Sequence, residues 1–271
     1  MSEFVVHSVP GSPFGRSVLI ALEEKGAPYR LAALAPGDSK GAAHLARHPF
    51  GRVPVLAHDG FVLYETQAIL RYLDRVLPEP ALTPADVRQA ARMDQVMNVS
   101  DWYLFQGVCN VILFQRIVGP QFFGTTTDEA AIARAMPQAR TVIAELSRLL
   151  GEQPFMVGDH LSLADLQAAP QASFLSLTPE WAELTAGHPN LVAWIERLEA
   201  RPSCDGRRHG YATFSRVINP GYIAAGRFHF SCDVGRRASA SAAPDRPPQR
   251  PDDRMTKPGR RDGLDASART P

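Results

Sequence analysis

The chain has 271 residues, of which 45% are hydrophobic, and its 29 Lys and Arg nearly balance its 28 Asp and Glu. This length accommodates one large domain or two small ones with real hydrophobic cores, which excludes a fibrous or wholly disordered protein. The net charge of +1 provides no overall field for a phosphate backbone, so we expect no nucleic-acid partner. No apolar run reaches the roughly 20 residues that span a bilayer, and residues 1–4 lack signal-peptide features. We therefore expect a cytoplasmic protein without membrane contact.

The three cysteines, Cys109, Cys204 and Cys232, are odd in number and widely spaced. They form no Cys-x-x-Cys pair, so neither a disulfide framework nor a zinc site is indicated. We expect reduced thiols and no bound metal.

The charge distribution marks a boundary near residue 204. Residues 205–271 contain 13 Lys and Arg, seven Asp and no Glu, whereas the chain before them is net acidic. From about residue 235 onward large apolar residues are nearly absent, so we predict disorder there. Residues 205–234 have aromatic side chains without a helical period and form either a docked extension or further unstructured chain. A basic tail could contact nucleic acid or anionic membrane, but its interleaved acids favour a solvated tail. A reading-frame change near Cys204 would also explain the boundary.

The first 78 residues alternate between strand and helix patterns. Ser12 before Pro13 is the preferred arrangement of a helix N-cap followed by proline at the first helical position. The order of elements is typical of an α/β domain in which helices cover a small mixed sheet. We predict strands at 3–7 and 29–33, helices at 13–25 and 40–47, a hairpin of strands 53–57 and 61–63, and a helix at 66–77.

Pro54 stands where an interior strand residue is expected, and proline there removes a hydrogen-bond donor from the sheet. Taken alone, an edge strand is the simpler explanation. The alternative is a cis-proline turn that leaves the backbone groups of Val53 free to pair with a peptide ligand.

Residues 79–204 show helical patterns only. We expect a long helix that breaks near Gly119-Pro120, followed by helices at 129–150 and 191–200. Ser162 and Asp165 have the spacing of a capping box, flanked by leucines that suit a hydrophobic staple. Replacing either residue is expected to cost about 0.5 to 2 kcal/mol.

Four segments of the first 78 residues carry a family resemblance. They read SPFGR at 12–16, APGDSK at 35–40, HPFGRVPVL at 48–56 and YETQAI at 64–69. Together, and followed by an all-helical half, they resemble a glutathione S-transferase of the serine type, nearest the phi and tau classes. The resemblance implies a thioredoxin-like glutathione-binding domain at 1–78, an all-α domain at 79–204 and an atypical extension at 205–271. It also implies a detoxification enzyme.

By this resemblance Ser12 is the catalytic residue, whose hydroxyl donates to the thiolate of glutathione, and the helix that begins at Pro13 adds the positive end of its dipole. Lowering the pKa of the glutathione thiol by about two units from about 8.5 requires that the site stabilise the thiolate over the thiol by roughly 2.7 kcal/mol. A role as a plain N-cap stays open for Ser12. The two roles are compatible, because capping uses the oxygen as an acceptor and thiolate binding uses the proton. Ser8 and Ser17 are lesser candidates.

The resemblance further assigns residues to the γ-glutamyl and cysteinyl parts of glutathione. Val53 would pair its main chain with the cysteinyl backbone, with Pro54 in the cis form. Glu65 and Thr66 at a helix start suit the ammonium and the carboxylate of the γ-glutamyl end. An ordinary helix N-terminus is the alternative for this pair, and Thr66 stands where serine is more usual.

Lys40 and Arg52 would face the glycine carboxylate, although a solvated charge is an equal alternative for both. Ser39 and Arg52 stand where phi-class proteins often have histidine and glutamine. Phe50 resembles a residue that some relatives insert into the partner subunit, which implies a homodimer; burial within its own domain is the alternative.

The apolar electrophile is expected in a pocket between the domains. Phe14 would contact it by motif position. Further candidates for its wall are Trp102, Phe105, Phe114, Phe122 and Phe123.

Two functions follow from these residues. The first is an enzyme that attaches the glutathione thiolate to an apolar electrophile, or reduces an organic peroxide with the same thiol. The second is a non-catalytic transferase-like module for ligand binding or assembly. No cysteine lies near Ser12 and no tyrosine precedes Tyr29, which disfavours the cysteine-type and tyrosine-type relatives. The double-serine and cysteine motif of the zeta-class isomerases is also not present.

Overall fold

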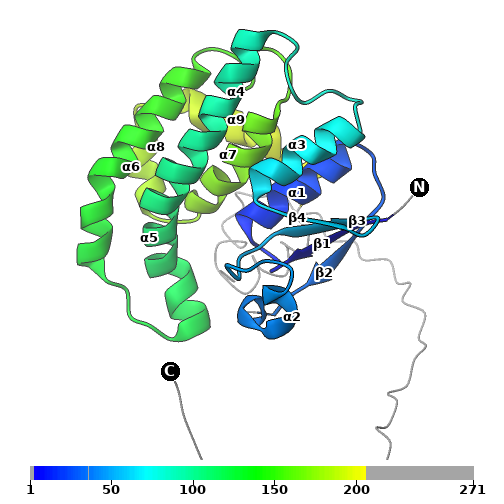
Figure 1. Cartoon of the computed structure of the whole chain (residues 1–271). Coiled ribbons are helices and arrows are strands. Elements are labelled where there is room, and N and C mark those ends of the chain that lie inside the picture. The colour runs from blue at the N-terminus through cyan, green and yellow to red at the C-terminus, as the bar shows by residue number, and fades with distance from the viewer. Residues whose placement is uncertain (1–2, 36, 206–271) are drawn as a thin grey trace, which may run out of the picture. The chain divides into compact units, whose positions relative to one another are not determined.

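The computed structural model describes residues 3–35 and 37–205 (Figure 1). The predictions of a disordered tail and of a docked extension lie outside these residues, as does Cys232. The described residues belong to one compact unit.

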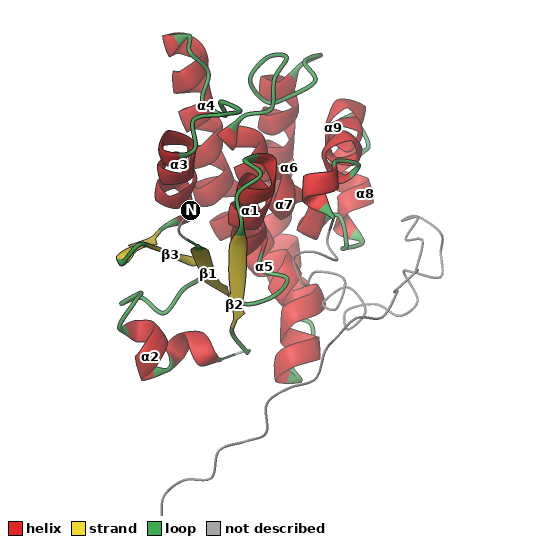
Figure 2. Ribbon diagram, turned by 90° about the vertical axis from the view of Figure 1, so that its right-hand side faces the viewer, coloured by secondary structure: helices red, strands yellow, loops and turns green. Residues whose placement is uncertain are grey.

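Within the described residues, the first part of the chain forms a four-stranded sheet with the spatial order β2-β1-β3-β4. β1 pairs in parallel with β2 and antiparallel with β3, and β3 pairs antiparallel with β4. The strands are β1 (Phe4–Ser8), β2 (Tyr29–Ala33), β3 (Val55–His58) and β4 (Phe61–Tyr64). Helices α1 (Pro13–Glu24) and α3 (Thr66–Val76) cover one face, and the short α2 (Ala42–Leu45) lies on the other side (Figure 2). The predicted α/β arrangement is confirmed.

Local sequence signals explain these elements. The Ser12 side chain accepts a hydrogen bond from the Gly15 amide at the start of α1, as an N-cap does. Asp59 and Gly60 both have positive φ, at 51° and 79°, which is the geometry of a two-residue hairpin turn between β3 and β4. The predicted helix at 40–47 is shorter in the structure, where a 3-10 turn at Asp38–Lys40 precedes α2.

The helical half begins with one long rod. It consists of α4 (Val87–Val99), a π-helical stretch (Ser100–Cys109), α5 (Asn110–Leu113) and a second π-helical stretch (Phe114–Phe123). The predicted break near Gly119-Pro120 is wrong, because the rod continues to Gly124, which has a positive φ of 63°. In a π-helix the amide of residue 120 would donate to the carbonyl of residue 115. Proline lacks that amide, and the Thr127 hydroxyl donates to the Gln115 carbonyl instead, at 3.0 Å.

All residues of α7 (Leu163–Leu175) are buried, because the helix packs against α1, the long rod and α9. The predicted helix at 129–150 is confirmed as α6 (Glu129–Leu150), and the predicted last helix is α9 (Pro189–Glu199). A short α8 (Glu180–Thr185) was not predicted. The capping box of Ser162 and Asp165 is present at the start of α7.

The two halves of the described chain share one hydrophobic core, in which α1 packs against α3 and α7. Arg16 of α1 is buried and forms a bidentate ion pair with Glu199 of α9, at 2.8 and 2.6 Å. Lys25 at the other end of α1 binds Asp74 and the Pro80 carbonyl, both at 2.6 Å. The Arg16–Glu199 pair holds α1, and with it Ser12, against the helical half, whereas Lys25 ties the other end of α1 to α3 and to the segment that follows it.

Among the described helices, none combines the length and the apolar character needed to cross a membrane. No group of His, Cys, Asp or Glu within residues 3–35 and 37–205 is arranged to hold a metal ion. Cys109 and Cys204 are buried free thiols.

Candidate active site

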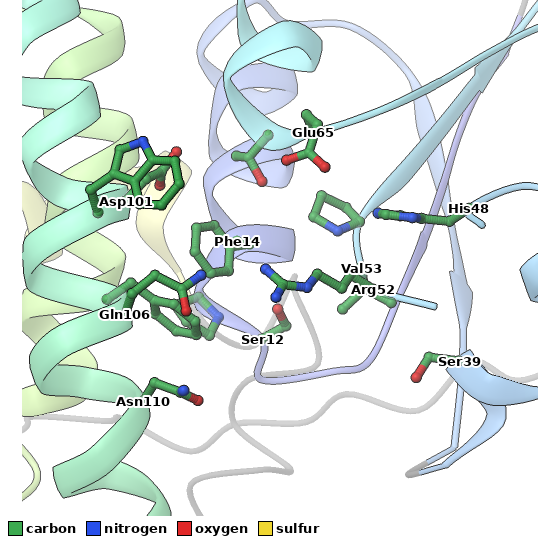
Figure 3. Close-up of a pocket in the computed structure, with 15 residues that line it drawn as sticks. Ser12, Phe14, Ser39, His48, Arg52, Val53, Glu65, Asp101, Gln106 and Asn110 are labelled. Carbon is green, nitrogen blue, oxygen red and sulfur yellow. The ribbon is translucent and has the colours of Figure 1, made fainter. Parts of the chain in front are cut away.

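A cavity of about 570 Å³ lies where the start of α1, the start of α3 and the first π-helical stretch meet (Figure 3). It brings together most of the residues that the sequence assigns to glutathione. Those that line it are Ser12, Phe14, Arg52, Val53, Pro54, Glu65 and Thr66.

Ser12 lies at the N-terminus of α1 with its hydroxyl on the cavity wall. Its oxygen accepts from the Gly15 amide at 3.3 Å, and its proton is donated to no group among the described residues. The hydroxyl can therefore donate to a ligand while it caps the helix. Ser8 and Ser17 do not line this cavity, and Ser17 donates its proton to the Pro13 carbonyl at 3.1 Å.

Two backbone features shape the opposite wall. The peptide bond between Val53 and Pro54 is cis, and Val53 lies before the start of β3, outside the sheet pairing. Glu65 has a positive φ of 71°, a conformation that costs a non-glycine residue of order 1–3 kcal/mol. It precedes Thr66, the first residue of α3, so the carboxylate of Glu65 and the hydroxyl of Thr66 both border the cavity.

Two carboxylates, Glu65 and Asp101, lie at one end of the cavity (Figure 3). Asp101 comes from the π-helical stretch and accepts from three neutral amide side chains, those of Gln67 at 2.8 Å, Gln167, and Gln171 at 3.5 Å. Burial raises the pKa of Asp101, the three amides oppose that rise, and the nearby charge of Glu65 adds to it. Within the part of the chain that the structure describes, no cationic side chain forms an ion pair with Asp101 or Glu65, so this end of the cavity suits a positively charged ligand group.

The rest of the described cavity wall carries the guanidinium of Arg52 and the imidazole of His48. Arg52 reaches into it from the loop before Val53, and Ser39 lies on its far side (Figure 3). His48 is 2% exposed, stacks on Tyr64 with ring centroids 4.5 Å apart, and has no partner for its buried Nδ1. Burial lowers the pKa of His48. Lys40 does not line the cavity, and its ammonium donates to the Phe50 carbonyl at 3.1 Å.

A second cavity, of about 660 Å³, adjoins the first and is almost entirely apolar. Its wall includes four of the aromatic candidates, Phe105, Phe114, Phe122 and Phe123. The structure places the other two, Phe14 and Trp102, on the first cavity instead. Phe14 meets Phe105 edge to face at 4.4 Å, so this aromatic pair stands near the junction of the two cavities. Ser12, Pro13, Phe105 and Asn110 line both.

Comparison with known proteins agrees with this geometry. The family model described as "Glutathione S-transferase, N-terminal domain" matches residues 6–81, and "Glutathione S-transferase, C-terminal domain" matches residues 129–197. The "Probable glutathione S-transferase GSTF2" of Oryza sativa subsp. japonica is 33% identical over 184 residues, 67% of this chain and 85% of that protein. The chain belongs to the glutathione S-transferase family. The predicted family, its phi-class resemblance and the assignment as a transferase enzyme are confirmed.

Solved structures of this family confirm the thioredoxin-like and all-helical fold. A glutathione S-transferase-I bound with lactoylglutathione is 28% identical, with a TM-score of 0.67, over 77% of this chain and 98% of the other. A glutathione S-transferase from Methylobacterium radiotolerans, in complex with glutathione sulfonate, is 32% identical, with a TM-score of 0.61, over 74% and 92%.

Four polar residues of the first cavity were not predicted from the sequence: His48, Asp101, Gln106 and Asn110. His48 is the first residue of the segment HPFGRVPVL, so the sequence placed it near the site but did not show that its side chain faces the cavity. Asp101 and Asn110 lie on the helical rod, and their facing depends on the π-helical stretch, which changes the angular position of every residue after Ser100 relative to an α-helix.

Proposed function

We propose that this transferase activates glutathione through Ser12 and attaches its sulfur to an apolar electrophile. The observation that carries the proposal is the position of the Ser12 hydroxyl, which lines both the polar and the apolar cavity with its proton uncommitted among the described residues. A thiolate held there faces the space where an apolar co-substrate fits.

Glutathione fits the charge pattern of the first cavity. The ammonium group of the γ-glutamyl residue lies against Glu65. The carboxylate of the same γ-glutamyl residue accepts hydrogen bonds from the Thr66 hydroxyl and from the backbone amides at the start of α3. The cysteinyl backbone pairs with the main chain of Val53, next to the cis Pro54. The glycine carboxylate lies toward Arg52, with Lys40 as a second cation whose ammonium has donors beyond its bond to Phe50.

The sulfur then lies beside Ser12. The hydroxyl donates to the thiolate, and the N-terminus of α1 contributes the positive end of its dipole, which together lower the thiol pKa. The thiolate attacks an electrophilic carbon held in the apolar cavity, with Phe14 and Phe105 at the junction. Reduction of an organic peroxide by the same thiolate is a second reaction of this site. No protein side chain becomes covalently modified, and no metal takes part.

The proposal includes a homodimer. Phe50 is 64% exposed, which is against its burial within its own domain, and Trp102 and Tyr103 are exposed at 69% and 56%. Several large apolar side chains exposed on one protein are typical of an interaction surface. A second copy of the chain is the partner that the family suggests.

Turnover tests the proposal. Wild type is expected to conjugate glutathione to a generic halonitroarene, and Ser12→Ala to lose at least about tenfold in kcat, which corresponds to roughly 1.4 kcal/mol. Equal rates in Ser12→Ala and wild type would contradict the mechanism. Glutathione binding without turnover of any electrophile would favour the ligand-binding module instead.

A further inference from the structure

The apolar cavity contains few groups that can hydrogen-bond to a substrate. Among the described residues of its wall, the polar side chains are those of Ser12, Cys109 and Asn110, and the other side chains are Val, Leu, Ala, Pro and Phe. The Cys109 thiol is buried and directed to the Gln171 carbonyl at 3.8 Å. Ser12 serves the glutathione sulfur in the proposed function. Asn110 is therefore the amide left for the second substrate.

Asn110 differs from the other asparagines of the described residues. Asn98 donates to the Asp94 carbonyl at 2.8 Å, and Asn190 binds Ser147 and Gly151 through both ends of its amide. Within residues 3–35 and 37–205, the Asn110 side chain has no hydrogen-bond partner. It is the first residue of α5, directly after the π-helical stretch, and its amide points from the helix into the cleft on the side where Ser12 lies (Figure 3).

We propose that Asn110 is a catalytic residue that donates a hydrogen bond to the oxygen of an α,β-unsaturated carbonyl substrate as the glutathione sulfur adds to it. The inference rests on the proposed function, since it needs the thiolate at Ser12. It assigns to this chain a residue, Asn110, that selects flat conjugated carbonyl compounds with an apolar or aromatic body from among the electrophiles of the proposed function.

The chemistry of the addition requires a donor at this place. A lone pair of the thiolate forms the new carbon–sulfur bond at the β-carbon, the alkene π pair shifts toward the carbonyl carbon, and the carbonyl π pair moves onto oxygen. The resulting enolate takes a proton from water at the α-carbon, which replaces the proton that the thiol released. Nothing is oxidised or reduced. The charge that starts on sulfur beside Ser12 thus ends on an oxygen a few bonds away, where a pre-placed N–H group stabilises the transition state.

The amide of asparagine suits this reaction better than peroxide reduction. A departing alkoxide needs a proton, which a carboxamide does not supply, whereas an enolate oxygen needs only a hydrogen bond until water protonates the carbon. The five phenylalanines of the cavity wall offer flat faces to a conjugated body, and the rings of Phe114 and Phe123 are stacked with their centroids 6.1 Å apart.

Two probes with the same aromatic body test the inference. Benzylideneacetone has the conjugated carbonyl, whereas benzyl chloride reacts with the thiolate by displacement of chloride and has no carbonyl oxygen. The kcat/KM of each is measured with saturating glutathione in wild type, Asn110→Ala, Asn110→Asp and the control Asn98→Ala, whose side chain lies on the same rod outside both cavities.

Asn110→Ala is expected to lower kcat/KM for the enone about tenfold or more and to change that for benzyl chloride less than about twofold, since one lost donor at a developing oxyanion costs up to about 10²–10³ in kcat. Asn110→Asp is expected to lower the enone rate further, because a carboxylate repels the enolate. Asn98→Ala is expected to leave both rates unchanged.

An equal loss for both probes in Asn110→Ala, or no loss for the enone, would overturn the role of Asn110 while leaving the Ser12 mechanism in place. Wild-type turnover of benzyl chloride but not of the enone would also overturn it. If wild type turned over neither probe, the proposed function would fail, and this inference with it.

Discussion

Asp165 offers a quantitative test of how the helical half is held together. Its fully buried carboxylate accepts four hydrogen bonds: from the Ser162 amide at 2.9 Å, the Ser162 hydroxyl at 2.7 Å, the Met156 amide at 2.8 Å and the Trp194 indole N–H at 2.9 Å. The bond from the Ser162 amide is part of the capping box, the bond from the Ser162 hydroxyl joins the same two side chains, and the other two bonds fasten a loop and α9 to the start of α7.

We predict that Asp165→Ala lowers the free energy of unfolding by about 4 kcal/mol. The lost cap accounts for about 1 kcal/mol. The Met156 amide and the Trp194 indole N–H become buried donors without an acceptor, at roughly 1–3 kcal/mol each. The sum is a large fraction of the roughly 5–15 kcal/mol that stabilises a typical domain.

Urea unfolding of wild type and variants, followed by circular dichroism, measures this difference from the midpoint and the m value. Asp128→Ala is the matched control, because Asp128 caps α6 through a single exposed bond to the Ala131 amide at 3.0 Å. It is expected to cost about 1 kcal/mol. Asp165→Asn keeps the shape and one acceptor oxygen and should fall between the two. If Asp165→Ala cost no more than Asp128→Ala, the carboxylate would not fasten the loop and α9, and the reasoning would be refuted.

Three further predictions concern pH, binding and assembly. Burial acts to raise the pKa of Asp74, but hydrogen bonds from Lys25, Thr83 and the Leu82 amide hold that pKa below its usual value. The stabilising effect of the ionised carboxylate is therefore lost as pH falls below about 4. Asp74→Asn should reduce the loss of stability between pH 6 and pH 3, measured by urea unfolding, and an unchanged loss would contradict this account. Arg52→Ala should raise KM for glutathione about threefold to tenfold with little change in kcat, and an unchanged KM would remove Arg52 from the glutathione site. Phe50→Ala should shift the mass in analytical ultracentrifugation from dimer toward monomer, whereas a monomeric wild type would end the dimer proposal.

The sequence was sufficient for the fold wherever local signals and the period of apolar residues agree. Ser12 followed by Pro13 defines the start of α1 and Gly151 ends α6, so α1 begins and α6 ends where predicted. The hairpin turn lies at Asp59 and Gly60 as predicted, but β3 begins at Val55 rather than at residue 53. For Asp165 the capping box alone predicts a smaller cost than the structure does, because the bonds from Met156 and Trp194 come from residues outside the local sequence pattern.

The site was predictable where residues of one short segment act together. Val53 with Pro54 and Glu65 with Thr66 line one cavity as neighbours in the chain. Asp101 and Asn110 could not be placed in the same way, because the π-helical stretch alters which residues of the rod face α1. Lys40 lies in a segment that matches the family pattern, but its ammonium donates to the Phe50 carbonyl and the residue does not line the cavity. The sequence pattern therefore placed the residue but not the direction of its side chain.

The most direct test of the proposed mechanism is the thiolate absorbance of glutathione bound to wild type and to Ser12→Ala as a function of pH. It requires no knowledge of the electrophile. We predict that the bound thiol titrates about two pKa units below its free value in wild type, which corresponds to roughly 2.7 kcal/mol, and that Ser12→Ala loses most of this shift. A bound thiol that titrates at its free value in wild type, or an equal shift in Ser12→Ala, would contradict activation by Ser12.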